Sequence, residues 1–304
     1  MPELPEVETV RAGLAKSMPG ATITGIKIND ARSLKRHLSG SADFKRKLVG
    51  SQVLDVVRRG KFLWLPLDQS STALVGHLGM SGQMLVRTPN FPEDKLTRVT
   101  IEFETKTGKP LELRFVDQRI FGSLAIDDLI ETRDGGTGGF SAGKNRAKAW
   151  EKVIPISAAH IARDPLDESF DQELVVEKMR VKKSGIKRVL LDQNLLSGIG
   201  NIYADESLWL AKLHFDRNAE DISKAKLREL LEISKQVLAA AVKQGGTSFD
   251  EQYKNVNGES GYFSQQLYAY GQTDKPCARC QTPIRRQAWA NRGSHFCPKC
   301  QRPS

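Results

Sequence analysis

The chain has 304 residues, 39% of them hydrophobic and 27% charged, which is enough to bury a sizeable core in about two domains. This composition excludes a disordered or fibrous chain, and no apolar run approaches the roughly 18 residues that a membrane helix needs. Lysine and arginine number 46 against 36 acids, a formal charge of +10 that suits a polyanionic partner, nucleic acid before an anionic membrane. Because the N-terminus carries acids where an export signal needs basic residues, we expect a cytoplasmic protein.

The first ten residues, MPELPEVETV, place a proline at position 2 with three carboxylates behind it. Removal of the initiator Met1 would leave Pro2 as a free secondary amine, and an α-amino group titrates at roughly 7.7–8.0. A simpler interpretation is that Pro2 only resists aminopeptidases and starts a strand; these ten residues alone favour it. The residues that follow predict an amphipathic helix within 1–16, because apolar side chains recur at helical spacing at Val7, Val10 and Leu14.

The next part of the chain predicts many short strands separated by Gly, Pro and Asp, as in a β-sandwich or barrel. The expected strands are 22–28, 52–57, 61–67, 72–76, 83–87, 98–104, 111–116 and 121–126. The stretch Arg133–Lys148 (RDGGTGGFSAGKNRAK) is rich in glycine and basic residues and has no periodicity. We expect it to be a flexible insertion near a domain boundary.

From about Asp164 the pattern becomes helical, with apolar residues at three- and four-residue spacing. The expected helices are 171–180, 185–194, 200–211 and 223–244. Between two of them LSGIGN (Leu196–Asn201) predicts a pair of tight turns, an arrangement that presents backbone amides and a helix N-terminus to phosphate. Glycine turns between helices are common, so this pattern is only moderately specific.

The four cysteines lie near the C-terminus in the pattern C-x2-C-x16-C-x2-C. They are Cys277, Cys280, Cys297 and Cys300. This spacing predicts one structural zinc ion held by four thiolates, with a β-hairpin between the two pairs. The alternative, two disulfides, does not suit a cytoplasmic chain. From Ser260 onward there are seven basic residues and one acid, so the segment is suited to contact phosphate.

Several motifs together resemble the formamidopyrimidine-DNA glycosylases, bacterial base-excision enzymes that remove 8-oxoguanine and ring-opened purines and then cut the strand. The matching motifs span nearly the whole chain in family order. Besides the N-terminal decapeptide and the zinc hairpin, they are RRGKFL (Arg58–Leu63), GHLGMSG (Gly76–Gly82), DQRIFG (Asp117–Gly122) and GIGNIYADESL (Gly198–Leu208).

The resemblance implies an α+β fold in four parts. These are an N-terminal catalytic β-sandwich domain with flanking helices (1–132), a flexible insertion and linker (133–170), a helical DNA-binding domain with a helix–two-turn–helix (171–270) and a zinc finger (271–304). It also implies a monomer that acts on damaged double-stranded DNA in the bacterial cytoplasm, in association with the nucleoid, with no membrane partner.

The family chemistry gives Pro2 a catalytic role. By resemblance its amine attacks the anomeric carbon of the damaged nucleotide, expels the base and forms a Schiff base that permits β- and then δ-elimination. Glu3 would protonate the sugar ring oxygen, Lys61 would assist β-elimination, and Arg292 would clamp phosphate and assist δ-elimination. Glu6 would help to shape the site. Without the family context, both acids are equally explained as favourable charges at a helix N-terminus.

The resemblance also implies side chains that fill the duplex when the damaged base is flipped out. Phe121 would wedge between base steps, Met80 would fill the gap, and Arg119 would pair with the orphaned cytosine; without the family context, Met80 and Phe121 would be assigned to the core. Further DNA contacts are expected at His77, Lys182, Lys187 and Asn201.

The chain departs from the family pattern at several positions. Gln118 and Ile120 stand where the family commonly has proline and arginine, which would soften the loop, and Leu96 and Arg98 stand where many members carry histidines. Compact members have no counterpart of the Arg133–Lys148 insertion, which is either inert or adds nonspecific DNA affinity.

Two alternatives stay open. One is the sister branch, endonuclease VIII, which excises oxidised pyrimidines with the same proline chemistry; Leu4, GHLGMSG and the Arg119/Phe121 pair favour the purine branch. The other is a noncatalytic DNA-binding protein that uses only the zinc ribbon and the helix pair; the joint presence of Pro2, Glu3 and Lys61 argues against it. Lesion choice would depend on the loop Asn255–Phe263.

Overall fold

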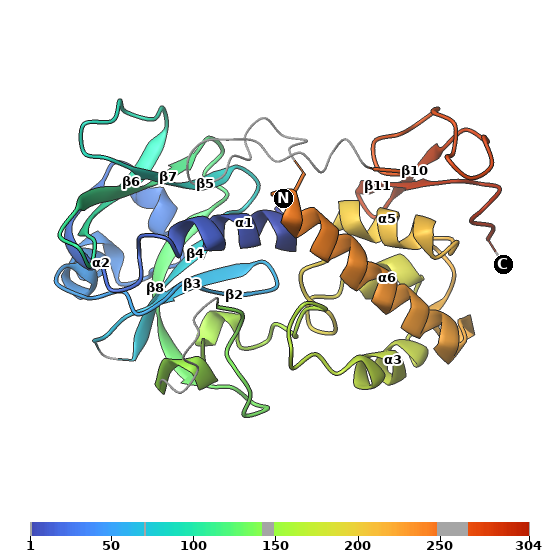
Figure 1. Ribbon diagram of the computed structural model, residues 1–304, viewed down its shortest axis with the longest axis horizontal. Helices are drawn as coiled ribbons and strands as arrows, with labels where there is room; N and C mark the ends of the chain where they lie inside the picture. Colours follow the sequence, from blue (N-terminus) through green and yellow to red (C-terminus); the bar gives the residue numbers. More distant parts are fainter. Residues whose placement is uncertain (1, 70, 142–148, 248–266, 304) are drawn as a thin grey trace. The chain divides into compact units, whose positions relative to one another are not determined.

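The computed structural model describes residues 2–69, 71–141, 149–247 and 267–303, which form two compact units (Figure 1). The first unit runs to His160 and includes residues 245–247; the second begins at Ile161 and includes the terminal hairpin. The expected α+β architecture is confirmed: a two-sheet unit, a helical region and a β-hairpin that carries the cysteines. None of the described helices is long and apolar enough to cross a bilayer.

Two antiparallel sheets build the first unit (Figure 1). One sheet has the strand order β1 (Thr22–Ile28), β6 (Thr97–Glu104), β7 (Pro110–Asp117) and β5 (Gly82–Arg87). The other has the order β2 (Val57–Arg59), β3 (Phe62–Pro66), β4 (Thr72–His77), β8 (Ser123–Glu131) and β9 (Val153–Pro155). Alternating side chains from both sheets, such as Leu74 and Phe103, are fully buried in one core, as a sandwich requires.

Two helices complete this core. Helix α1 (Leu4–Leu14) buries Val7, Val10 and Leu14, the three residues whose spacing predicted it. Helix α2 (Gly40–Leu48) was not predicted, because its sequence GSADFKRKL offers only Phe44 and Leu48 as a buried pair four residues apart.

The first compact unit extends to His160, because β9 pairs with β8 and extends the five-stranded sheet. The expected division of the chain into four parts stays a prediction. In the described part of the expected insertion, Phe140 and Arg58 exchange backbone hydrogen bonds of 2.7 and 3.0 Å. The Arg11 and Arg58 guanidiniums lie over the Phe140 ring. Residues 142–148 of this segment lie outside the described residues.

Four α-helices and a hairpin build the described part of the second unit. The helices are α3 (Gln172–Arg180), α4 (Ile186–Leu190), α5 (Asn201–Leu210) and α6 (Lys224–Lys243), and the hairpin strands are β10 (Arg285–Trp289) and β11 (Arg292–Phe296). Asp171 and Ser223 cap the N-termini of α3 and α6 with their side chains. Gly198, at φ +92°, makes the sharp turn before α5 that the sequence predicted. Because β11 packs on α5, the helices and the zinc hairpin belong to one compact unit. The expected separation into a helical domain and a zinc finger stays a prediction.

Candidate active site and zinc centre

The N-terminal corner of the first unit is closely packed around Pro2, which is buried at the start of α1. The Glu6 carboxylate, 6% exposed, accepts the Glu3 backbone N–H at 2.9 Å through Oε2. Its Oε1 accepts the backbone N–H and the hydroxyl of Thr247 at 2.7 and 3.0 Å. A Cβ on Gly246 would lie 2.7 Å from the same oxygen, so this close approach requires glycine. Glu6 therefore fixes the chain around Pro2.

Lys61 lies at the tip of the β2–β3 hairpin, in a two-residue turn after Gly60. A buried ion network anchors this hairpin to α1. Arg58, 1% exposed, donates from Nε to Glu8 Oε2 at 2.9 Å, and Arg11 pairs with the same carboxylate at 2.9 Å. Arg58 also donates to the Gly60 carbonyl at 3.1 Å. The network thus couples the helix that starts behind Pro2 to the turn that carries Lys61.

The loops that carry Met80 and Phe121 lie against each other. Met80 is 39% exposed and Phe121 51% exposed, so neither belongs to the core. A Cβ on Gly79 would lie 2.5 Å from the Phe121 carbonyl carbon, which shows how tightly the loops pack. Arg119 is exposed on the same loop. The structure therefore brings together the three side chains expected to fill the duplex.

Asp117 anchors this loop pair, although its own side chain is fully buried. Its carboxylate accepts the Ser81 hydroxyl at 2.5 Å and the backbone N–H groups of Arg119 and Gly122 at 3.1 and 2.7 Å. Lys35 Nζ donates to the carbonyls of Ile120 and Phe121 at 2.7 and 3.2 Å. The loop with Gln118 and Ile120 is thus held from both sides.

Three residues of this region have backbone or side-chain positions that the sequence did not predict. Ile120 has φ +57°, a left-handed conformation that is strained for a β-branched residue. Arg98 donates to the Asp117 carbonyl at 2.8 Å and pairs with Asp30 at 3.2 Å, so it supports the loop from within the protein. Leu96 is 47% exposed and also has positive φ, +66°.

His77 lies at the end of β4, next to the Met80 loop. Its Nδ1 accepts the Gly79 N–H at 3.2 Å. Burial, together with the charges of Arg36 and Lys35, lowers the pKa of His77 from 6.5 to about 4. His77 is therefore a neutral hydrogen-bond donor near neutral pH.

In the second unit, Arg292 follows the tight turn of the β10–β11 hairpin and is exposed. Ala290 and Asn291 form the turn with φ +43° and +61°, as a two-residue hairpin turn of the primed type requires. Asn201, the first residue of α5, donates from Nδ2 to the Gly293 carbonyl at 3.0 Å. The structure therefore places Asn201 beside the turn that presents Arg292.

Lys187 does not lie where we expected it. Its side chain is fully buried, pairs with Asp205 at 2.6 Å and donates to Ser294 Oγ at 2.8 Å and the Gly293 carbonyl at 3.3 Å. A buried ammonium with these partners is not available to a phosphate, so the expected direct DNA contact is corrected to a positioning contact for the hairpin. Lys182, in contrast, is exposed and lies 3.7 Å from Asp192.

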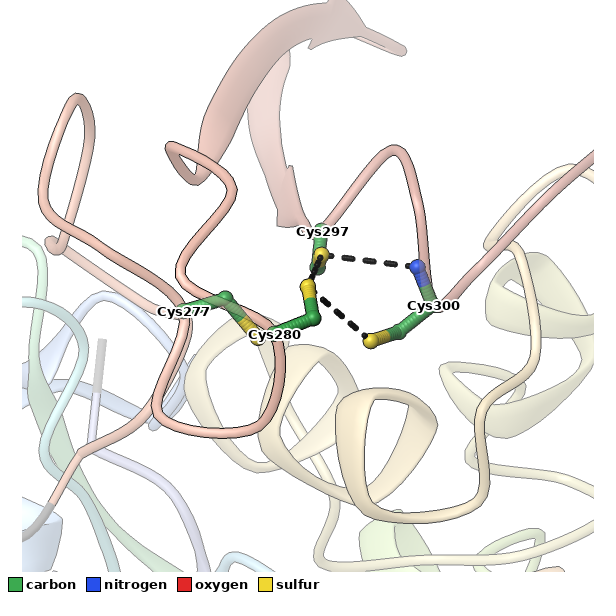
Figure 2. Close-up of side chains that lie close together, drawn as sticks. All are labelled: Cys277, Cys280, Cys297 and Cys300. Carbon is green, nitrogen blue, oxygen red and sulfur yellow. Dashed lines mark hydrogen bonds between the residues drawn. The ribbon is translucent and has the colours of Figure 1, made fainter.

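The four cysteines converge on one point, and Figure 2 shows their side chains facing a common centre. Their sulfur atoms all lie within 4.8 Å of one another, with 3.4 Å between Cys280 and Cys297 and between Cys280 and Cys300. Sulfurs about 2.3 Å from a tetrahedral zinc would be about 3.8 Å apart, so the donor set fits zinc, whereas a disulfide needs about 2.05 Å. These residues hold one structural zinc ion.

Sequence reasoning missed three buried acids that hold the site together. Glu8 pairs with Arg58, Asp205 pairs with Lys187, and Glu206 accepts three consecutive backbone N–H groups from Tyr268 to Tyr270 at 2.8–2.9 Å. A charge on the apolar face of a helix is the pattern that would have pointed to them. The predicted lesion loop Asn255–Phe263 lies outside the described residues.

The fold and the site define a protein of two units with a buried N-terminal proline and a four-cysteine zinc centre. Three family models match the chain in order: the formamidopyrimidine-DNA glycosylase N-terminal domain at residues 1–124, the H2TH domain of the same enzymes at 161–252, and a zinc finger found in FPG and IleRS at 274–303.

Comparisons over the whole chain give the same family as the three domain models. The chain is 52% identical to a formamidopyrimidine-DNA glycosylase of Leifsonia xyli, covering 99% of this chain and 100% of the relative, and 50% identical to one of Rhodococcus opacus, covering 99% and 97%. It superposes with a TM-score of 0.80 and 31% identity on a Lactococcus lactis FPG mutant in complex with a Fapy-dG containing DNA, covering 99% of this chain and 100% of that one. The chain belongs to the formamidopyrimidine-DNA glycosylase family and is a DNA glycosylase of oxidised-base repair.

Proposed function

We propose that this enzyme excises 8-oxoguanine and formamidopyrimidines from duplex DNA through a Schiff base on Pro2 and then cuts the strand by β,δ-elimination. The observation that carries the proposal is the N-terminal corner. Buried carboxylates fix Pro2 at the start of α1, and the same helix is joined through Glu8 and Arg58 to the turn that carries Lys61. A nucleophile needs such fixed geometry, and a pure DNA binder has no use for it.

The chemistry uses a secondary amine that removal of Met1 exposes. The Pro2 nitrogen attacks C1′ of the damaged nucleotide while the C1′–base bond breaks, and the departing base takes up the amine proton. Glu3 then protonates the sugar ring oxygen, and the C1′–O4′ bond breaks as the nitrogen lone pair forms the C=N bond. The iminium that forms acidifies the C2′ proton. Its loss expels the 3′ phosphate with assistance from Lys61, and a second elimination expels the 5′ phosphate with assistance from Arg292.

Access to the base requires that it leave the stack. Phe121 and Met80 are exposed apolar side chains on adjoining loops, suited to enter the duplex. Arg119 is exposed on the Phe121 loop, and we expect it to pair with the orphaned cytosine. His77, Lys182, Asn201 and Arg292 supply phosphate contacts. The protein is proposed to act as a monomer in the bacterial cytoplasm, in association with the nucleoid.

A single-turnover cleavage assay tests this function. Protein with Met1 removed should convert a duplex with 8-oxoguanine opposite cytosine to the β,δ-product, whereas protein that retains Met1 should bind the duplex and leave it intact. Cleavage of a thymine glycol duplex with no cleavage of the 8-oxoguanine duplex would assign the chain to the endonuclease VIII type. Binding without cleavage of either substrate would leave a noncatalytic DNA-binding protein.

A further inference from the structure

Residues 137–141, which the proposed chemistry leaves unused, lie along one edge of the five-stranded sheet; we call them the brace segment. Strand β2 is an edge strand of that sheet. Arg58 of β2 and Phe140 exchange both of their backbone hydrogen bonds, at 2.7 and 3.0 Å, as directly opposed residues of an antiparallel pair do. The brace segment therefore covers part of the sheet edge that β2 forms.

Two glycines of the brace segment are required by close contacts. A Cβ on Gly139 would overlap the carbonyl oxygen of Arg58 in β2. A Cβ on Gly138 would overlap the carbonyl oxygen of Val153 in β9, and the Gly138 N–H donates to the Glu151 carbonyl at 2.6 Å. The brace segment thus contacts β2 and β9, the two edge strands of the same sheet. Its glycines allow this approach because they have no side chain.

Polar contacts hold the brace segment on both sides of Phe140. Arg59, 6% exposed, donates from Nη2 to the Thr137 carbonyl at 3.0 Å. The Ser141 hydroxyl donates to Asp55 Oδ2 at 2.8 Å. Because both partners lie at the start of the β2–β3 hairpin, these contacts join the brace segment to that hairpin.

The Phe140 ring contacts the buried ion network between α1 and the β2–β3 hairpin. The guanidinium carbons of Arg11 and Arg58 lie 5.2 and 5.8 Å from the ring centroid, within the range of cation–π contacts. Arg58 also donates to Glu8 Oε2 at 2.9 Å and to the Gly60 carbonyl at 3.1 Å. Its guanidinium therefore contacts α1, the brace segment and the turn of the hairpin at the same time.

We propose that Phe140 is a positioning residue for Lys61. Phe140 holds the Arg58 guanidinium, and Arg58 holds the Gly60 carbonyl, so that the turn keeps Lys61 in place for β-elimination. This role rests on the proposed function in that it takes up the assistance to elimination given there to Lys61. Phe140 acts through Arg58 and does not touch the DNA. The brace segment is then a built part of the active site, and neither an inert insertion nor a source of nonspecific DNA affinity.

Single-turnover cleavage by Phe140→Leu tests the proposal. Leucine keeps an apolar side chain but removes the ring face that the guanidiniums contact. Cleavage of a duplex with a preformed abasic site should slow about tenfold, because displacement of an assisting group has effects of that order or more. Excision of 8-oxoguanine, revealed by alkali after quenching, and affinity for a duplex with a noncleavable tetrahydrofuran site should be unchanged. Phe140→Tyr keeps the ring and should retain the wild-type rate.

Two results of this assay would overturn the proposal. One is a wild-type cleavage rate in Phe140→Leu. The other is an equal loss of base excision and of strand cleavage, since a general disturbance of the fold would slow both steps together.

Phe91→Leu is the matched control. The Arg87 guanidinium carbon lies 4.5 Å from the Phe91 ring centroid, in the region that joins β5 and β6 of the other sheet. This variant removes a similar contact between a ring and a guanidinium and should cleave the abasic duplex at the wild-type rate. Equal slowing in Phe91→Leu and Phe140→Leu would contradict a specific role of Phe140.

A double variant with Lys61→Gln separates this role from the proposed function. If Phe140 acts through Lys61, adding Phe140→Leu to Lys61→Gln should slow cleavage no further. Losses that multiply would reject the path through Lys61. Wild-type cleavage by Lys61→Gln would reject the role of Lys61 itself, and the role of Phe140 with it. Slow cleavage by Lys61→Gln with wild-type cleavage by Phe140→Leu would reject the role of Phe140 alone.

Hydrogen exchange tests the brace segment without an activity assay. The amides of Arg58 and Phe140 donate to each other's carbonyls, so both should exchange slowly in the wild-type protein. Phe140→Leu should speed exchange of the Arg58 amide at least tenfold, and Phe91→Leu should leave it unchanged. Fast exchange of both amides in the wild-type protein would overturn the proposal.

Discussion

Asp205→Asn tests the buried pair that supports the Arg292 hairpin. Asp205 is 1% exposed and its Oδ1 lies 2.6 Å from the fully buried Lys187 ammonium, while Oδ2 accepts the His295 N–H at 2.8 Å. The asparagine keeps the shape and an acceptor for His295 but removes the charge. Lys187 would then lose the anionic partner Asp205, while its hydrogen bonds to the neutral Ser294 hydroxyl and Gly293 carbonyl would remain. Removing one member of a buried pair destabilises by about 3–5 kcal/mol.

Urea unfolding followed by circular dichroism, together with the rate of zinc release, measures this loss. Glu229→Gln is the control, since its carboxylate pairs with Lys226 on the surface at 2.8 Å and such pairs contribute about 0–1 kcal/mol. The double change Asp205→Asn with Lys187→Met removes both charges and should recover much of the lost stability. A loss below about 1 kcal/mol in Asp205→Asn, or a double variant less stable than the single one, would refute the reasoning.

Three further predictions concern zinc, pH and the wedge. Cys297→Ser should lose zinc by atomic absorption and weaken DNA binding, because the hairpin depends on the metal for its fold; full affinity without zinc would contradict this. Since the folded pKa of His77 lies below its unfolded value, stability should fall as pH drops from about 6.5 towards 4, by about 1–2 kcal/mol between pH 7 and 5. His77→Gln should remove the fall in Tm between pH 7 and 5. If the variant showed the same fall as the wild-type protein, His77 would not be its cause. Phe121→Ala should change the unfolding free energy by less than about 0.5 kcal/mol but slow base excision at least tenfold in single turnover; equal rates would exclude the wedge.

The regular elements were largely predictable because local pattern and tertiary packing agree in them. Strand β1 has the predicted bounds, Thr22–Ile28, and α6 buries one stripe of leucines at helical spacing. The strand expected at 52–57 failed, because Gln52 and Val53 make only isolated bridges and the ladder begins at Val57. Nothing in the sequence shows that β9 returns to the first sheet, since that pairing depends on contacts distant along the chain.

The sequence motifs indicated which positions belong to the candidate site. They did not indicate whether each side chain is buried or exposed, or which residues it contacts. The motifs pointed to Lys61, Met80 and Phe121, and the structure places each on a tight turn or an exposed loop. Lys187 fits the same motif-based argument but is buried, because its partner Asp205 is on another helix and their pairing appears only in three dimensions.

Borohydride trapping on a duplex with 8-oxoguanine opposite cytosine, followed by peptide mass spectrometry, tests the central claim most directly. Reduction of the Schiff base should leave a stable DNA adduct on the N-terminal peptide, with the mass increase on Pro2, and protein that retains Met1 should give none. An adduct on a lysine, or cleavage of the duplex without any trapped adduct, would contradict the assignment of Pro2 as the nucleophile.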